Sequence, residues 1–117
     1  MQYEYFYGAQ AEQFSFYRIP KALFTEPNFR ELSTDAKVLY GILLDRMSLS
    51  LKNQWLDAQN KVYIIFTVEE IMDALNCANQ KATRLMVELE KQAGLIERKR
   101  QGLGRPNLIY VKNFAAT

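Results

Sequence analysis

The sequence predicts a mainly helical α+β domain, a winged helix-turn-helix with a two-stranded β-wing and an N-terminal aromatic arm. Two amphipathic helical patterns are joined by the short turn "NCAN", and such a tight junction is typical of a helix-turn-helix. A hairpin pattern with a Gly-rich tip, "LIERKRQGLGRPNLIYV", follows the second helix directly. The 117 residues fit one compact domain, so we expect these elements to share one core.

The first 17 residues contain seven aromatic side chains. Their partial alternation gives the period of two that a strand shows. An isolated arm of this kind would expose a large ring surface. We therefore expect residues 1–19 to dock on their own domain or on a second subunit, with base stacking as a third alternative, and residues 20–117 to form the domain. The candidates for dimerisation are Tyr3, Tyr5, Phe6, Tyr7, Phe14 and Phe16.

A short helix, a long helix and a strand are expected before the turn. Pro20 suits the first turn of a helix over "PKALF", because its missing N–H would find no partner there. Ser33 and Asp35 supply a capping oxygen and a negative charge at the start of a longer helix. "VYIIF" (62–66) predicts a short buried strand, and Trp55 is expected to cover the core from the loop before it. The core stripe of the long helix is Ala36, Leu39, Tyr40, Leu43 and Met47.

The helix-turn-helix has clear start and stop signals. Thr67 and Glu70 form a Thr-x-x-Glu capping box, and Asn76 can end the first helix in a left-handed conformation. The second helix is expected from Asn79 to Ala93. Cys77, in the turn, is interpreted as a packing residue rather than a reactive thiol.

The outward face of the second helix carries residue types that can read base edges. Helical phase puts its apolar side chains on one side and its polar ones on the other. Gln can pair with adenine, Arg with guanine, and a Thr or Val methyl can meet the thymine methyl. Glu88 and Glu90 would repel phosphate, and any exposed helix carries polar residues, so this face alone favours DNA only slightly. The candidates are Asn79, Gln80, Lys81, Thr83, Arg84 and Lys91.

The hairpin strengthens the case for nucleic acid. Its cations cluster within eight positions, whereas a hairpin built only for solubility would normally mix the signs of its charges. Gly102 and Gly104 remove side-chain bulk from the tip, so Arg105 suits the minor groove or the phosphate backbone. The strand period of two allows either Arg98 with Arg100 or Lys99 with Gln101 on the DNA-facing side. The candidates in the wing are Arg98, Lys99, Arg100, Arg105 and Asn107.

The charge is distributed unevenly along the chain. Residues 1–75 carry 7 basic and 10 acidic side chains, whereas residues 76–117 carry 8 basic and 3 acidic ones. Positive charge therefore gathers in the last third, where a polyanion can use it.

Several function classes find no support in the sequence. Histidine is absent, and we see neither a nucleophile elbow nor a Gly-x-x-x-x-Gly-Lys phosphate loop, so we expect no enzyme and no cofactor. A single Cys and no His exclude a Cys/His zinc site and favour a reducing, cytoplasmic setting. No apolar run reaches the length of a membrane span.

The stretches "QAEQFSFYRIPKALFT", "LSTDAKVLYGILLDRMSLS" and "FTVEEIMDALNCANQKATRLMVELEKQAGLIERKRQGLGRPNLIYVKNF" resemble the N-terminal domain of the RepA_N family. These are replication initiator A proteins of theta-replicating plasmids in Gram-positive bacteria, including staphylococcal multiresistance plasmids. The resemblance runs from about Tyr3 to Phe114. It implies a recognition helix over Asn79 to Lys91 and a wing over Arg98 to Asn107.

The resemblance also implies a mode of action. Family members bind repeated sites, called iterons, within the initiator coding region, and a C-terminal domain, absent here, engages host replication proteins. We therefore expect sequence-specific binding to double-stranded DNA at a plasmid origin, by a homodimer or a higher assembly. The alternatives are a winged-helix module for protein assembly and a transcriptional repressor. The resemblance alone favours replication over repression.

Overall fold

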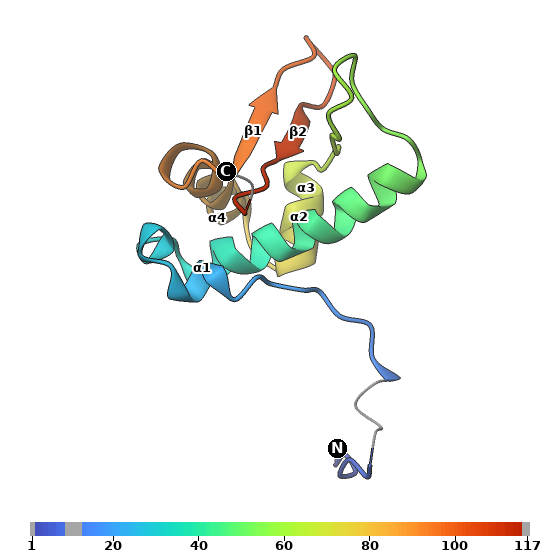
Figure 1. Ribbon diagram of the computed structural model, residues 1–117, viewed down its shortest axis with the longest axis vertical. Coiled ribbons are helices and arrows are strands. Elements are labelled where there is room, and N and C mark those ends of the chain that lie inside the picture. The colour runs from blue at the N-terminus through green and yellow to red at the C-terminus, as the bar shows by residue number, and fades with distance from the viewer. Residues whose placement is uncertain (1, 9–12, 116–117) are drawn as a thin grey trace.

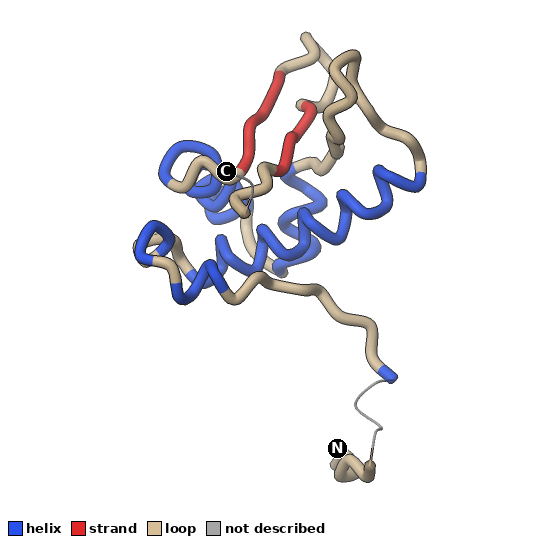
Figure 2. Tube along the Cα trace, viewed as in Figure 1, coloured by secondary structure: helices blue, strands red, loops and turns tan. Residues whose placement is uncertain are grey.

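The computed structural model describes residues 2–8 and 13–115. In chain order these form α1 (Ala22–Thr25), the 3₁₀ turn η2 (Pro27–Phe29), α2 (Thr34–Lys52), α3 (Val68–Leu75), α4 (Asn79–Val87), the π-helical turn η3 (Glu88–Gln92), β1 (Ile96–Lys99) and β2 (Leu108–Val111). The long helix α2 packs against α4 and β2, and α3 packs against α4, with the hairpin rising beside them (Figure 1, Figure 2). This arrangement confirms the predicted winged helix-turn-helix.

Helix α2 is the long helix against which the core packs. Ser33 caps it, and its hydroxyl oxygen accepts a hydrogen bond from the Ala36 N–H at 3.2 Å. The predicted stripe is confirmed, since Leu39 and Leu43 are fully buried and Met47 packs at the edge. Burying a Leu side chain stabilises a fold by about 1.5–3 kcal/mol. The packing of this stripe therefore stabilises α4 and β2 against the same helix.

The helix-turn-helix forms as its caps predict. Both halves of the capping box are present: the Glu70 N–H donates to Thr67 Oγ1 at 3.1 Å, and the Thr67 N–H donates to Glu70 Oε1 at 3.0 Å. Asn76 adopts the left-handed conformation, with φ 54° and ψ 52°. Cys77 is half-buried against the core, in agreement with a packing role.

The predicted strand over 62–66 is reduced to single bridges. Ile64 exchanges two hydrogen bonds of 2.9 Å with Ile109 of β2, and Val62 pairs with Leu56. Ile64 is fully buried, so the apolar segment does enter the core. Trp55 stacks on Tyr63 at 6.2 Å in the preceding loop and is half-buried. Val62 thus pairs within the loop, and Ile64 alone bridges to β2.

The predicted helix from Asn79 to Ala93 is regular only as far as Val87. Beyond that point the chain winds more widely, and the Ala93 N–H donates to the carbonyl of Glu88 at 3.0 Å, five residues back. Such a turn accommodates one extra residue in a helix. It changes the direction of the side chains that follow it.

The aromatic arm stands away from the domain in Figure 1, at the opposite end of the long axis from the tip of the hairpin. Its rings are largely exposed, with exposed fractions that run from 50% at Phe14 to 85% at Tyr3. Phe14 stacks edge-on against Phe6 and Phe16, at 5.9 and 6.3 Å. The residues numbered 9–12 lie outside the described part of the chain.

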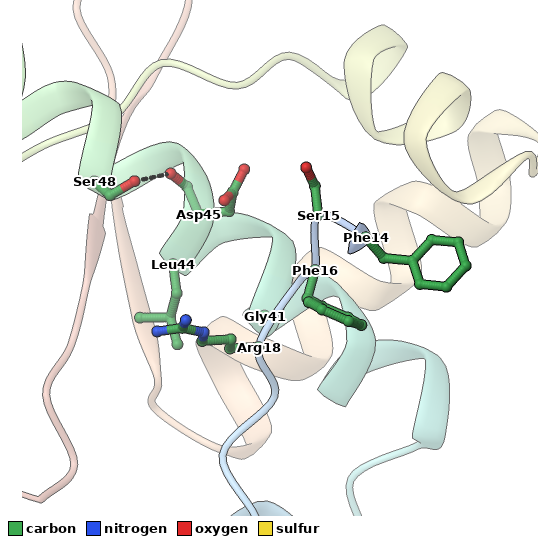
Figure 3. A pocket seen from close by; sticks show the side chains of 8 residues that line it. All are labelled: Phe14, Ser15, Phe16, Arg18, Gly41, Leu44, Asp45 and Ser48. Carbon is green, nitrogen blue, oxygen red and sulfur yellow. Dashed lines mark hydrogen bonds between the residues drawn. The ribbon is translucent and has the colours of Figure 1, made fainter. Parts of the chain in front are cut away.

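The arm meets α2 at Gly41. A Cβ atom built there would lie 2.9 Å from both the Arg18 carbonyl oxygen and Ile19 Cγ1. Figure 3 shows the extended arm crossing the helix at this point, beside a hollow whose floor includes Leu44 and Asp45. Glycine therefore permits the close approach.

Candidate nucleic-acid interface

The outer face of α4 is open to solvent. Its inner side is buried, with Ala82 and Leu85 at 0% exposure, and Leu89 of η3, also at 0%, continues this side. The opposite side agrees with the predicted phase and includes Val87, an apolar residue that is 39% exposed among polar neighbours. The exposed residues on this side are Gln80, Thr83, Arg84, Val87 and Lys91. Asn79 is also exposed at the first position of α4, and its side-chain oxygen accepts from the Thr83 hydroxyl at 3.4 Å.

One flank of this helix is tied to the start of α2. Lys81 Nζ lies 2.7 Å from Asp35 Oδ2, so its charge is directed toward α2 rather than outward. Glu88 is 8% exposed, and its two carboxylate oxygens accept from the Ser33 N–H and the Ser33 hydroxyl, each at 2.8 Å. Glu88 therefore does not lie on the exposed face, because its carboxylate is buried at a helix N-terminus, where a negative charge is favourable.

The other flank is tied to the wing through Glu90. Arg98 donates from Nε at 3.0 Å and from Nη2 at 2.8 Å to one oxygen of Glu90, and its backbone N–H donates to the other oxygen at 3.1 Å. Burial acts to raise the pKa of Glu90, but the hydrogen bonds and charge of Arg98 hold that pKa below its ordinary value. The negative charge of Glu90 is thus offset within the protein.

The wing divides its basic residues by direction. The register pairs Arg98 with Ile109 and Lys99 with Leu108. Arg98 is half-buried toward Glu90, whereas Lys99 and Arg100 are exposed. The strand ends at Lys99, so the alternation that would place Arg98 and Arg100 on one side stops before Arg100.

The tip of the wing is a shaped turn. Gly102 and Gly104 have φ values of 119° and 76°, a region that favours glycine. The Arg105 N–H donates to the Gly102 carbonyl at 3.3 Å, and Gln101 Nε2 donates to the Pro106 carbonyl at 2.7 Å across the base of the turn. Arg105, which is exposed, lines a hollow of about 290 Å³ together with Asn107, also exposed, and the start of α3.

Leu103 at this tip was not among the sequence candidates. Its side chain is fully exposed, at 103% of the reference area. The signal in the sequence was its position between two glycines that flank a turn. An apolar residue held out beside Arg105 suits the wall of a groove.

Among residues 2–8 and 13–115, no helix is long and apolar enough to cross a membrane. The same residues hold no cluster of three or more His, Cys, Asp or Glu side chains placed to bind a metal ion.

Comparison with known proteins decides the family. Residues 15–117 match the family described as "Replication initiator protein A (RepA) N-terminus". The chain belongs to this family. The match covers α1 through β2 and begins within the arm, so the whole winged helix-turn-helix lies inside the RepA N-terminus.

Solved structures agree with this assignment. A structure described as "N-Terminal domain of DNA binding protein" superposes with a TM-score of 0.78 at 39% identity, over 96% of this chain and 85% of that one. "Structure of Rep-DNA complex" gives 0.77 at 39% identity, over 94% and 84%. "Structure of MDR initiator" gives 0.76 at 40% identity, over 97% and 89%.

The curated relative is a "41 kDa protein" of Lactobacillus helveticus, 32% identical over 92 residues. The alignment covers 79% of this chain and 26% of that protein. The RepA N-terminus described here therefore spans about a quarter of the length of this relative.

Proposed function

We propose that this chain is the sequence-specific, double-stranded DNA-binding part of a plasmid replication initiator and acts on repeated origin sites. The observation that carries the proposal is the exposed polar face of α4 beside a basic wing. The likeness to a Rep–DNA complex along 94% of the chain supports it. A major groove about 12 Å wide admits one α-helix with its outer side chains on base edges.

Within this proposal α4 reads the bases. Gln80, Thr83 and Arg84 share the outer face, and a bidentate pair from Arg84 to guanine would be worth about 1–3 kcal/mol of discrimination. Lys91 lies further along the same face, toward the backbone. Asn79 sits at the start of the helix, where backbone N–H groups favour a phosphate. Lys81 can contact DNA only if its ion pair with Asp35 breaks.

The wing supplies cations for phosphate or the minor groove. Lys99, Arg100 and Arg105 are exposed, and Asn107 lies beside Arg105. Arg98 already donates to Glu90. Each phosphate contact that is lost should lower the salt slope of binding by about one unit.

In this proposal the arm offers an apolar surface on which a second copy of the chain can pack. Phe6, Phe14 and Phe16 form an edge-stacked cluster that remains 50–64% exposed. We expect it to join homodimers or higher assemblies, as repeated sites require. Sedimentation of a Phe14→Ser/Phe16→Ser variant should show loss of association, whereas Phe24→Ser, an equally exposed ring on α1, should leave it intact.

The rest of a longer initiator would engage host replication proteins, and the plasmid target places the protein in the cytoplasm. No step of DNA binding as proposed here calls for catalysis or a cofactor.

Fluorescence anisotropy tests the proposal. Origin-repeat and scrambled duplexes of equal length are titrated at several salt concentrations with wild type, Arg84→Ala and the charge-matched control Arg30→Ala. Specific binding should exceed non-specific binding by about 10³ or more. Arg84→Ala should lose most of that preference, and Arg30→Ala should keep it.

Equal, weak binding of both duplexes would overturn specific recognition and direct attention to a protein-assembly role. Tight, specific binding without support of plasmid replication by the full-length initiator would favour a repressor.

A further inference from the structure

The turn η3 places two carboxylates on opposite flanks of the proposed recognition helix. Glu88 and Glu90 are two positions apart, so they point to nearly opposite sides of a helix. Both are held within the protein, in contrast to Lys91, which follows Glu90 and is exposed. This turn of five residues follows α4 and precedes β1 of the wing in the chain.

On one flank, Glu88 binds the turn to the N-terminus of α2. Its carboxylate takes both the N–H and the hydroxyl of Ser33, and the same hydroxyl accepts from the Ala36 N–H. A buried, fully hydrogen-bonded carboxylate at the start of α2 fixes the end of α4 relative to that helix.

The Glu90 flank reaches the wing by three hydrogen bonds. Two come from the guanidinium of Arg98 and the third from the backbone N–H of β1 itself. The side chains of Glu90 and Arg98 are only 16% and 24% exposed, so the pair is partly shielded from salt. Glu90 therefore binds the backbone of β1 as well as the side chain of Arg98.

We propose that Glu90, anchored through η3, sets the angle of the wing to α4 by holding Arg98, and that Glu90 and Arg98 are positioning residues for DNA recognition. The inference rests on the proposed function, because the angle matters when α4 and the wing meet one duplex. Two reading elements gain from a fixed relative orientation, since a rigid pair loses less freedom on binding.

The two roles open to Glu90, repelling phosphate or positioning the wing, predict effects of opposite sign when its charge is removed. Removing a carboxylate near DNA ordinarily strengthens binding, because it removes repulsion of phosphate. If Glu90 positions the wing, Glu90→Gln should weaken binding, because one of its two acceptor oxygens becomes an NH₂ that cannot accept. Glu97→Gln is the matched control, since Glu97 is exposed on the same strand and carries the same charge.

The experiment compares wild type, Glu90→Gln, Glu97→Gln, Arg98→Gln and Arg98→Lys by anisotropy against origin-repeat and scrambled duplexes at several salt concentrations. Glu90→Gln should lower affinity for the repeats by about tenfold while Glu97→Gln raises or keeps it. Arg98→Gln should cause a similar loss with an unchanged salt slope. Arg98→Lys should recover part of the affinity, because it keeps the charge. Thermal melts establish that each variant is folded.

Two results of the binding experiment would overturn the inference. One is a Glu90→Gln variant that binds as well as the Glu97→Gln control. The other is a fall of about one unit in the salt slope for Arg98→Gln, which would make Arg98 a phosphate contact.

A measurement without DNA separates this inference from the proposed function. Amide hydrogen exchange should show faster exchange across β1 and β2 in Glu90→Gln than in Glu97→Gln. Unchanged exchange would refute the positioning role even if wild type bound the repeats. Lack of specific binding by wild type, with faster exchange in Glu90→Gln, would refute the proposed function and leave the link between η3 and the wing established.

Discussion

Single side chains at the wing tip combine two kinds of affinity for a nucleic acid. Leu103 stands fully exposed between Gly102 and Gly104, and Arg105 follows on the same turn. An apolar side chain gains by leaving water against the sugar walls of a groove, whereas a cation gains by releasing counterions. The two contributions can be separated because they respond differently to salt.

Leu103→Ser should weaken binding to origin repeats by about 1 kcal/mol, since part of a Leu surface no longer leaves water. The salt slope should stay as in wild type, because no charge changes. Arg105→Gln should lower the slope by about one unit. Anisotropy over a salt series measures both. A Leu103→Ser variant with wild-type affinity would place the tip outside the contact.

Among the elements, α3 is fixed at its capped start. The reciprocal bonds of Thr67 and Glu70 satisfy two N–H groups that the helix itself leaves free. Glu70 also lies 2.8 Å from Arg46 of α2, so the cap joins two helices.

Thr67→Ala should lower the free energy of unfolding by roughly 1 kcal/mol, the usual cost of losing an N-cap. Urea unfolding measures it. Thr34→Ala, an exposed substitution at the first position of α2, is the control and should change stability much less. Equal losses in the two variants would mean that the capping box contributes nothing specific.

The link between η3 and β1 should depend on pH. The pKa of Glu90 is lowered in the folded state, from an ordinary 4.5, so its contribution is complete above that value and is lost as the pH falls through the folded pKa. The stability difference between wild type and Glu90→Gln should therefore be constant well above pH 4.5 and shrink as the pH falls below that value. Chemical unfolding at several pH values checks this, and a difference that grew on acidification would contradict it.

At the scale of the whole molecule, the arm and the domain meet at a close approach over Gly41. An alanine there would gain helix propensity of about 1 kcal/mol, while its Cβ would collide with the backbone of Arg18. The two effects act on different parts of the protein, because the first stabilises α2 and the second displaces the arm.

Gly41→Ala should therefore keep or raise the melting temperature of the domain while tryptic cleavage after Arg18 becomes faster. Ser48→Ala, which lines the same hollow without adding atoms, is the control. Slower cleavage at Arg18 would show that the arm tolerates the added methyl.

Local signals made most of the fold predictable. Ser33, Thr67 and Asn76 announce helix ends by short-range hydrogen bonds and backbone preference, and the structure has each as expected. The π winding after Val87 could not be read from periodicity, because it depends on contacts with α2 and β1. The burial of Glu88 could not be read from periodicity either, because its partner, Ser33, lies 55 positions earlier.

The candidate site was predictable as a face but not in its pairings. The phase of α4 gave the exposed residues, since it needs only the buried stripe. Which cations were already engaged depended on tertiary neighbours, Asp35 for Lys81 and Glu90 for Arg98. The arm remained ambiguous because the same aromatic residues suit its own core and a second copy.

The wide winding of η3 has a consequence for how such proteins diverge. A π turn holds one residue more than a regular helix would, so deleting a single residue there would restore regular winding and leave the chain after it in nearly the same direction. The core beneath would still pack, but the side chains within the turn would move, and with them the contacts that Glu88 and Glu90 make on either flank. A one-residue gap at this position in a relative would therefore be compatible with the fold while removing the link between the turn and the wing.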